Sequence, residues 1–300
     1  WIGGMGVLVF VTAIIPNMSD RSMHIIRAEM PGPIIGKLVP RIKDTSRMLY
    51  LIYIFMTAVE IIFLLFGGLS LFESAVLSFG TAGTGGFTIK ADGIASYSPY
   101  VQWVITIFML VFGINFNIYY LCLIRRFRAA LKSEELWTYI GIVVISTAII
   151  TINLINGMPE FNNAGDTIRH AAFQVSSIIT TTGYATIDFN LWPNLSKAIL
   201  LLLMLSGGCA GSTAGGLKVS RVVILFKTIK KECHRLIHPR SVKAISFEGK
   251  ALDNNTRHGV TAYLAIYALC LLSIFFLLSF DSLSFESNMS AAISCFNNIG

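Results

Sequence analysis

Four long apolar runs most constrain how this 300-residue chain can fold. They cover Met48–Gly67, Val101–Ile124, Trp137–Ile155 and Thr261–Phe280, and the only acid within them is Glu60. A helix of about twenty apolar residues crosses a hydrocarbon core of about 30 Å. Charged residues make up 13% of the chain, whereas soluble domains usually carry about 25%. We therefore predict an all-α polytopic membrane protein.

Positive charge is distributed unevenly along the chain. Of its 23 Lys and Arg, six lie between Arg21 and Arg47, four between Arg125 and Lys132, and ten between Lys218 and Arg257. Cytoplasmic loops of membrane proteins carry an excess of Lys and Arg, so we predict that these three stretches face the cytoplasm. There, Arg125-Arg126-Phe127-Arg128 can fix the topology and contact anionic membrane lipid. This placement argues against nucleic acid as the partner behind the net charge of +7.

Three shorter, half-apolar segments lie between the spanning runs, on the side opposite the basic stretches. They are Leu69–Phe79, Thr167–Ile179 and Leu283–Phe296, and each is followed by a polar turn that contains glycine. A helix of about a dozen residues is too short to span a membrane, so it must enter and leave by one face. Non-helical backbone at membrane depth is tolerated only where protein or a water-filled cavity satisfies it. We therefore predict three pore loops.

The turns and the segments before them form a repeat. Gly183 follows Gly86 by 97 residues, and Gly300 follows Gly183 by 117 residues. When these glycines are aligned, the residue sixteen positions earlier is each time a good helix N-cap, and the residue six positions earlier is each time small. The N-cap candidates are Ser70, Thr167 and Ser284, and the small residues are Gly80, Ser177 and Ser294. One such turn alone would be an ordinary loop, but repetition at matched distances indicates a shared architecture.

A turn of this kind suits a cation. The carbonyl end of the short helix points its partial negative charge toward the membrane centre, and backbone carbonyls of the turn can replace the hydration shell of an ion. Glycine reaches backbone conformations that are closed to other residues, so neighbouring carbonyls can face one axis.

At these turns the sequence resembles the superfamily of K⁺ transporters that comprises bacterial TrkH and KtrB and the plant and fungal HKT and Trk proteins. The likeness covers essentially the whole chain, and it is stronger for the TrkH branch because Ala28–Pro33 and Pro40-Arg41 resemble its cytoplasmic linker. Trp1–Gly6 resembles the stretch that follows the first filter of the family. The second filter corresponds to Thr84-Gly85-Gly86-Phe87, the third to Thr181-Thr182-Gly183-Tyr184, and the fourth begins at Asn297-Asn298-Ile299-Gly300.

The resemblance implies four helix–pore loop–helix units in a pseudo-fourfold arrangement around one ion pore. We expect a fragment that lacks the first filter and the end of the fourth unit, with units at 1–47, 48–133, 134–255 and 256–300. The family also implies a homodimer, a cytoplasmic nucleotide-binding regulatory partner of the RCK type (TrkA-like), and the inner membrane of a bacterium. No cofactor is expected in this chain.

The resemblance further implies that filter backbone carbonyls bind K⁺ as the transported ion. The residues concerned are Thr84, Gly85, Gly86, Thr181, Thr182, Gly183, Asn298, Ile299 and Gly300. In this family a glycine at the aligned filter position goes with a preference for K⁺ over Na⁺. All three visible copies keep that glycine.

The third unit contains a second unusual stretch at 206–216, with five glycines in eleven residues. Each glycine costs a helix about 1 kcal/mol relative to alanine, and mid-membrane breaks of this kind tend to line ion pathways. Close helix packing through small residues is one interpretation. A phosphate-binding P-loop is excluded, because Leu217 separates the last glycine from Lys218. The resemblance favours a gate, which movement of the cytoplasmic segment 218–255 withdraws; its residues would be Gly207, Gly208, Gly211, Ser212, Thr213, Gly215 and Gly216.

The leading functional hypothesis is K⁺ uptake through a carbonyl-lined filter with this intramembrane gate. A symporter coupled to H⁺ or Na⁺ is the alternative. An intramembrane enzyme is a remote one, because it would need a nucleophile and base, or two carboxylates, at membrane depth. Glu60 has no evident partner for such chemistry in the sequence. As an acid within a spanning run it is a functional candidate, and the plainer interpretation is that it bonds the end of a pore helix.

Overall fold

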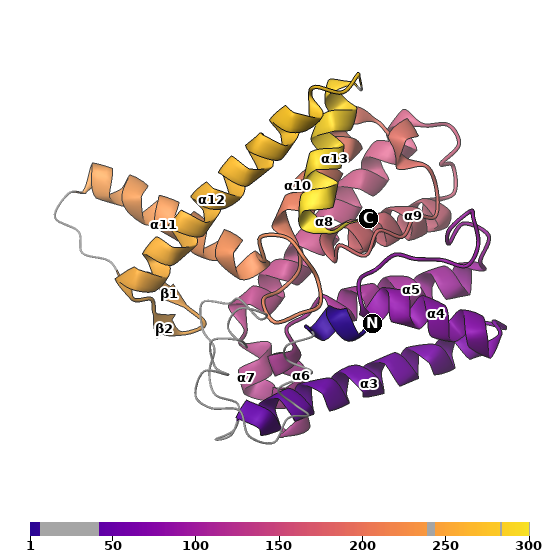
Figure 1. The fold of residues 1–300 in the computed structure, drawn as a ribbon, viewed down its shortest axis with the longest axis horizontal. Coiled ribbons are helices and arrows are strands. Elements are labelled where there is room, and N and C mark those ends of the chain that lie inside the picture. Colours follow the sequence, from indigo (N-terminus) through magenta and orange to yellow (C-terminus); the bar gives the residue numbers. More distant parts are fainter. Residues whose placement is uncertain (7–41, 239–243, 283, 300) are drawn as a thin grey trace.

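Three long helices of the computed structural model match three of the four predicted spans. They are α3 (Ile42–Phe66), α8 (Glu134–Gly157) and α12 (Asn254–Leu278), and each is long and apolar enough to cross a membrane (Figure 1). The structure describes residues 1–6, 42–238, 244–282 and 284–299. The linker motifs at 28–33 and 40–41 and the last filter residue, Gly300, lie outside the described residues. The three helices confirm the prediction of a polytopic membrane protein.

The predicted span Val101–Ile124 is bent and does not form one continuous helix. The run is divided into α5 (Pro99–Phe112) and α6 (Phe116–Leu123), which meet at an angle of 88°. Helix α5 ends at Gly113, and the side chain of Asn115 caps α6 by accepting a hydrogen bond from a backbone N–H two residues on, over 2.9 Å. An Asn cap offers the backbone an alternative to continuing the helix. Apolar periodicity alone does not register such a break.

The three predicted pore helices are present. They are α4 (Leu71–Ala82), α9 (Ala164–Ile179) and α13 (Phe285–Asn297). Each is preceded by one of the long helices and packs against it: α3 on α4, α8 on α9 and α12 on α13. The repeating unit of the sequence is therefore also the repeating unit of the fold.

Two of the three predicted helix caps are confirmed. Ser70 forms a full capping box with Glu73, and Ser284 caps α13. The prediction for Thr167 is wrong, because the cap of α9 is Asn163, four residues earlier. Thr167 lies inside the helix, and its hydroxyl donates to the Asn163 carbonyl over 2.8 Å. An Asn is as good a cap as a Ser or Thr, and it extends this pore helix by about one turn.

The region after the third filter is divided into two helices and a small hairpin. Helix α10 (Asn194–Ser206) and helix α11 (Val219–Ile237) flank the predicted gate, and β1 (Ser246–Phe247) pairs antiparallel with β2 (Lys250–Ala251). The all-α prediction missed this hairpin, which a two-residue turn closes. The remaining short elements are η1 (Ile2–Met5), α7 (Phe127–Leu131) and η2 (Phe189–Leu191).

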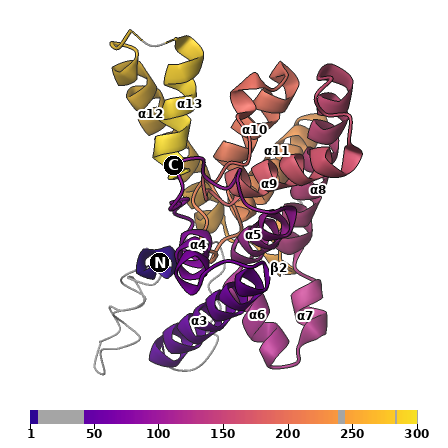
Figure 2. The same cartoon turned by 90° about the vertical axis from the view of Figure 1, so that its right-hand side faces the viewer.

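Helix α9 lies at the centre of the largest apolar cluster. Side chains of α8, α9, α10, α11 and α13 meet in it, among them the fully buried Ile150, Ala171, Val175, Ile179 and Ile224. Figure 2 shows the helices of the second, third and fourth units as three groups around the middle of the molecule. This arrangement brings the C-terminal ends of the pore helices toward one place.

Candidate functional site

The turn after each pore helix adopts one backbone conformation. The residue two positions before the aligned glycine is left-handed in all three copies, with φ of 51° at Thr84, 57° at Thr181 and 56° at Asn298. The N–H of the next residue donates to the carbonyl five residues earlier, over 2.8, 2.9 and 3.0 Å in the second, third and fourth turns. This hydrogen bond defines a Schellman motif at a helix end. The acceptors are the small residues Gly80, Ser177 and Ser294.

Left-handed backbone at a residue other than glycine is unfavourable by about 1–2 kcal/mol. Such strain persists where the surroundings fix it, and it is found mainly at functional sites. Here Gly80 leaves room for the Tyr184 hydroxyl, which would lie 2.2 Å from a Cβ at position 80. The Ser177 hydroxyl donates to the Tyr184 carbonyl over 2.6 Å. Gly80 therefore lets Tyr184 of the third filter pack against the second pore helix.

The second and third filters lie side by side. Gly86 and Gly183 both have positive φ, of 67° and 85°. A Cβ on Gly86 would lie 2.2 Å from the carbonyl oxygen of Thr182. Glycine is therefore required at position 86 both by its backbone conformation and by this close approach.

The predicted gate loop (206–216) lies against all three filters. The Gly215 N–H donates to the Thr181 hydroxyl over 2.7 Å, and the Thr84 hydroxyl donates to the Thr213 carbonyl over 3.2 Å. A Cβ on Gly215 would lie 2.4 Å from the carbonyl oxygen of Asn297 in the fourth filter turn. In Figure 1 the loop that joins α10 to α11 crosses the middle of the molecule. The structure thus brings the predicted filter and gate residues together, Gly300 excepted.

The gate loop also explains the break between α5 and α6. The Cys209 N–H donates to the Gly113 carbonyl over 2.9 Å, and the Phe116 N–H donates to the Gly211 carbonyl over 3.0 Å. These two bonds satisfy backbone groups that the bend leaves free. Because the partners lie about a hundred residues apart, no local pattern could link them.

The glycines of the loop allow it to fold back on itself. Gly207, Gly211 and Gly216 have positive φ, of 68°, 69° and 76°. A Cβ on Gly207 would lie 2.3 Å from the Gly215 carbonyl oxygen, and one on Gly208 would lie 2.7 Å from Cβ of Ala214. The loop therefore requires several of the glycines that the sequence singled out.

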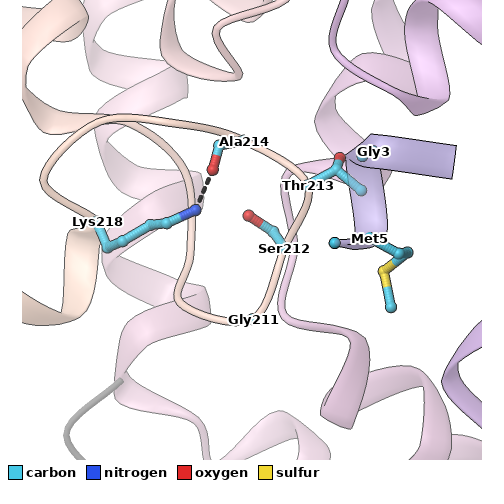
Figure 3. A pocket seen from close by; sticks show the side chains of 9 residues that line it. Gly3, Met5, Gly211, Ser212, Thr213, Ala214 and Lys218 are labelled. Atoms are coloured by element: carbon cyan, nitrogen blue, oxygen red, sulfur yellow. Dashed lines mark hydrogen bonds between the residues drawn. The ribbon is translucent and has the colours of Figure 1, made fainter. Parts of the chain in front are cut away.

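A cavity of about 170 Å³ lies between the gate loop and the N-terminal turn. Figure 3 shows Met5 and Gly3 on one side and the loop on the other, with the Lys218 ammonium turned toward the Ala214 carbonyl, to which it donates. Lys218 is buried, so a positive charge lies beneath the loop. The cavity is lined by Gly3, Gly4, Met5, Gly6, Gly211, Ser212, Thr213, Ala214 and Lys218.

Glu60 is fully buried in α3. Neither of its carboxyl oxygens has a hydrogen-bond partner of normal geometry among the described residues, although the Thr81 side chain lies beside it. Thr81 belongs to the last turn of α4. The position near a pore-helix end agrees with the plainer of the two interpretations, whereas the expected hydrogen bond is not formed.

Behind the third filter, His170 faces Thr186, with 2.9 Å between Nδ1 and the hydroxyl oxygen. The Arg169 guanidinium lies 3.4 Å from Nε2, and it pairs with Asp166. Burial, and after it the charge of Arg169, lowers the pKa of His170 below its ordinary value. The neutral imidazole is therefore favoured at this place on the pore-helix face.

Sequence reasoning missed Glu135, whose side chain bonds the gate loop and the first turn of α11. It accepts hydrogen bonds from the N–H groups of Ala210 and Ser220. It lies two positions before the predicted span Trp137–Ile155, so the apolar run does not single it out. A Ser–Glu–Glu start at 133–135 is typical of a helix N-terminus, which is the signal that could have drawn attention to it.

Comparisons with known proteins find related sequences and a similar solved structure. The family model TrkH, described as a cation transport protein, matches residues 1–300. The chain is 34% identical to the Trk system potassium uptake protein TrkH of Escherichia coli K12 and 30% identical to TrkG of the same strain. It also superposes on the crystal structure of the potassium transporter TrkH from Vibrio parahaemolyticus with a TM-score of 0.84 at 29% sequence identity. In each case the match covers 100% of this chain and 62% of the relative.

Proposed function

This chain belongs to the TrkH family of cation transport proteins, and we propose on that premise that it forms a K⁺ uptake pathway across the inner membrane of a bacterium. Its curated relatives are named potassium uptake proteins of Trk systems. The family consists of transport proteins, so an intramembrane enzyme is no longer a candidate.

The observation that carries this proposal is the shared backbone of the three filter turns. Three pore helices end in the same left-handed turn, and the turns converge on one loop. In this proposal carbonyls at 84–86, 181–183 and 298–300 replace the water around K⁺, and the carbonyl ends of the pore helices add partial negative charge. Binding of this kind holds the ion firmly enough to dehydrate it and loosely enough to release it.

The gate loop (206–216) closes the pathway in this proposal. Its contacts with the second, third and fourth filters support the role, because a chain in that position obstructs any route that leaves the filters toward the loop. Withdrawal of the loop would open the route. The packing alternative, in which the small residues only let helices approach, predicts a fixed loop.

The partners follow from the family and are part of the proposal. We expect a homodimer, a cytoplasmic nucleotide-binding regulatory protein of the RCK type, and membrane lipid around the spanning helices. The relatives are named as components of Trk systems, which supports an assembly rather than an isolated subunit.

Coupling of K⁺ uptake to H⁺ or Na⁺ is the alternative. The observation that favours it is Glu60, an acid buried beside the pore helix of the second filter. Uptake measured with and without H⁺ and Na⁺ gradients separates a symporter from a passive pathway.

The proposal is tested by uptake of radioactive Rb⁺ into liposomes that contain the full-length protein, with K⁺, Na⁺ and Li⁺ as competitors. We expect K⁺ to compete strongly and Na⁺ and Li⁺ weakly. We expect Gly183→Ser to cause a steep loss of this discrimination between K⁺ and Na⁺. Equal competition by all three ions in the unmodified protein would overturn K⁺ selectivity.

The gate is tested in the same liposomes by deleting 208–215. We expect a constitutive leak of Rb⁺. Because a deletion can unfold the protein, Gly215→Ala serves as a second variant, since its Cβ would meet the Asn297 carbonyl. Gly141→Ala is the control, because a Cβ there meets nothing within 4 Å. Unchanged flux and regulation in both gate variants would rule out the gate.

A further inference from the structure

The side chain of Glu135 connects the gate loop to the helix that follows it, α11. One oxygen, Oε1, accepts a hydrogen bond from the Ala210 N–H over 2.7 Å and another from the Ser220 N–H over 3.1 Å. Glu135 is 4% exposed and Ser220 is fully buried. A single side chain of α8 therefore holds a residue within the loop and the first turn of the helix that follows it.

The Ser220 contact has a second consequence. Ser220 lies in the first turn of α11, where backbone N–H groups have no partner within the helix. Lys218, at the N-cap position, makes no side-chain cap hydrogen bond. Glu135 supplies the missing acceptor, and a carboxylate is favoured at the positive end of a helix dipole. Without it, two buried N–H groups would lose their acceptor.

The hairpin β1–β2 reaches the same place from the cytoplasmic segment. Oε1 of Glu248 accepts a hydrogen bond from the Ser133 hydroxyl over 2.9 Å and one from the Glu135 N–H over 3.0 Å. The hairpin therefore caps the start of α8, at the residue that holds the gate loop.

The backbone of the hairpin turn is specialised for this contact. Glu248 and Gly249 both have positive φ, of 51° and 72°, as a two-residue type I′ turn requires. The first of these positions usually carries Asn, Asp or Gly, and Glu is strained there. Strain of this kind is kept where a contact depends on it.

Helix α11 is tied to the hairpin as well. The Lys227 ammonium donates to the Ser246 carbonyl over 2.7 Å and pairs with Glu134 over 2.5 Å. Both side chains of that ion pair are partly exposed, so it contributes modestly. Its position matters more, since it joins α11, the hairpin and the first turn of α8 in one cluster.

We propose that Glu135 is the clamp that holds the gate loop closed, and that the hairpin 246–251 controls this clamp from the cytoplasmic side. Displacement of the hairpin removes Glu248 from the start of α8. Glu135 then loses its position, and its contacts with the loop and with α11 are released together. This inference rests on the proposed gate. It names Glu135 and Glu248 as the residues that position the gate loop and the hairpin as the element that moves them. A two-state element biased by a partner is what coupling between distant sites requires.

Cys209 provides a measurement that does not depend on ion flux. It lies in the gate loop and is fully buried, one residue before the clamped Ala210. The full-length protein is reconstituted with Cys209 as its only cysteine, and the rate of maleimide labelling is measured. The cysteines of this chain that are replaced by serine are Cys122, Cys233, Cys270 and Cys295.

We expect Glu135→Ala to raise the labelling rate of Cys209 by about tenfold or more, since two buried N–H groups lose their acceptor. Glu135→Gln keeps an acceptor oxygen and should fall between Glu135→Ala and the unmodified protein. Glu248→Ala should give about a threefold increase, and combining it with Glu135→Ala should add nothing, because both act through one clamp. Glu232→Ala is the control, since its ion pair with Arg235 is exposed.

The outcomes separate this inference from the proposed function. Faster labelling together with an Rb⁺ leak supports both. Faster labelling without a leak supports the clamp and overturns the gate. A labelling rate unchanged in folded Glu135→Ala overturns the clamp and leaves the filter proposal intact. If Glu135→Ala does not fold, Glu248→Ala carries the test, and its failure to change the rate overturns the role of the hairpin.

Discussion

The second and third filters have the same backbone and very different surroundings. Both turns contain a left-handed threonine followed by the same hydrogen bond back into the pore helix. In the third filter Thr181 and Thr182 are each 1% exposed, and Tyr184 is equally buried. In the second filter the equivalent turn is half-buried, and Phe87, aligned with Tyr184, is 80% exposed. The turn therefore does not depend on being enclosed.

The hydroxyl of Tyr184 accounts for part of this difference. It lies near the carbonyls of Leu77 and Phe87, at 3.1 and 3.3 Å, both in the second unit. Phe87 has no hydroxyl with which to make an equivalent link. The third filter thus contacts the second unit through a side chain, whereas the second filter approaches the third through its backbone at Gly86.

The helices behind the two filters differ as well. Helix α4 carries a stripe of hydroxyl side chains at the positions where α9 carries aliphatic side chains. The aliphatic stripe of α9 packs into the largest apolar cluster. The hydroxyl stripe lies on the pore helix that packs against α3, the helix of Glu60. The aligned pairs are Ser74 and Ala171, Ser78 and Val175, and Thr81 and Ile178. One turn is therefore compatible with a polar and with an apolar backing, which indicates that the local helix-end motif specifies it.

The largest effect is expected where the two filters touch. Gly86→Ala places a Cβ 2.2 Å from the Thr182 carbonyl oxygen and forces a left-handed alanine. We expect Rb⁺ uptake to fall by at least about tenfold. Gly93→Ala is the matched control, because its φ of 65° imposes the same strain while its nearest neighbour, the Ala185 carbonyl oxygen, lies at 3.4 Å. Equal losses in both variants would show that backbone strain, and not filter contact, sets the effect.

The next effect concerns the link between the units. Tyr184→Phe removes the buried hydroxyl and leaves carbonyls of the second unit without their donor, which should lower the free energy of unfolding by about 1–3 kcal/mol. The reciprocal change, Phe87→Tyr, adds a hydroxyl to an exposed side chain and should change it by less than about 0.5 kcal/mol. Thermal unfolding in detergent measures both. Similar shifts in the two variants would contradict the asymmetry between the filters.

A smaller effect is expected from the stripes behind the filters. The Ser78 hydroxyl is buried and has no hydrogen-bond partner among the described residues. Ser78→Ala should therefore change the free energy of unfolding by no more than about 0.5 kcal/mol. Val175→Ser, at the aligned and fully buried position of α9, buries a new unpaired hydroxyl and should cost about 1–3 kcal/mol. A large loss in Ser78→Ala would mean that the hydroxyl stripe and Glu60 bind something between them.

The sequence predicted the parts of this molecule that local patterns encode. Apolar run length located three spans, and matched spacing located the pore helices and aligned the filter turns. The same spacing singled out Gly80, Ser177 and Ser294 as equivalent small residues. Their role as acceptors of the helix-end hydrogen bond is visible only in the backbone structure.

What the sequence could not predict depends on contacts between distant segments. The break at Gly113 is stabilised by a loop almost a hundred residues later, and the acceptor for the Ala210 N–H lies 75 residues away. The Thr167 error has a local cause, because two good caps compete within four residues and spacing favoured the wrong one. Alignment of repeats finds equivalent positions, but it does not find contacts that only one copy makes.

The smallest expected effect is a pH dependence confined to the third unit. His170 aligns with Glu73, the capping-box residue of the second unit, so only the third pore helix carries an imidazole there. Its pKa in the folded protein is lower than the ordinary 6.5, chiefly through burial. Below pH 6.5 the unfolded chain therefore binds more protons at this site, so stability is fully present above that value and decreases as pH falls through the window beneath it. We expect His170→Gln, which cannot titrate, to flatten the melting temperature between neutral and mildly acidic pH, whereas Glu73→Gln should leave that slope unchanged. An identical slope in His170→Gln and the unmodified protein would assign the acid sensitivity to another group.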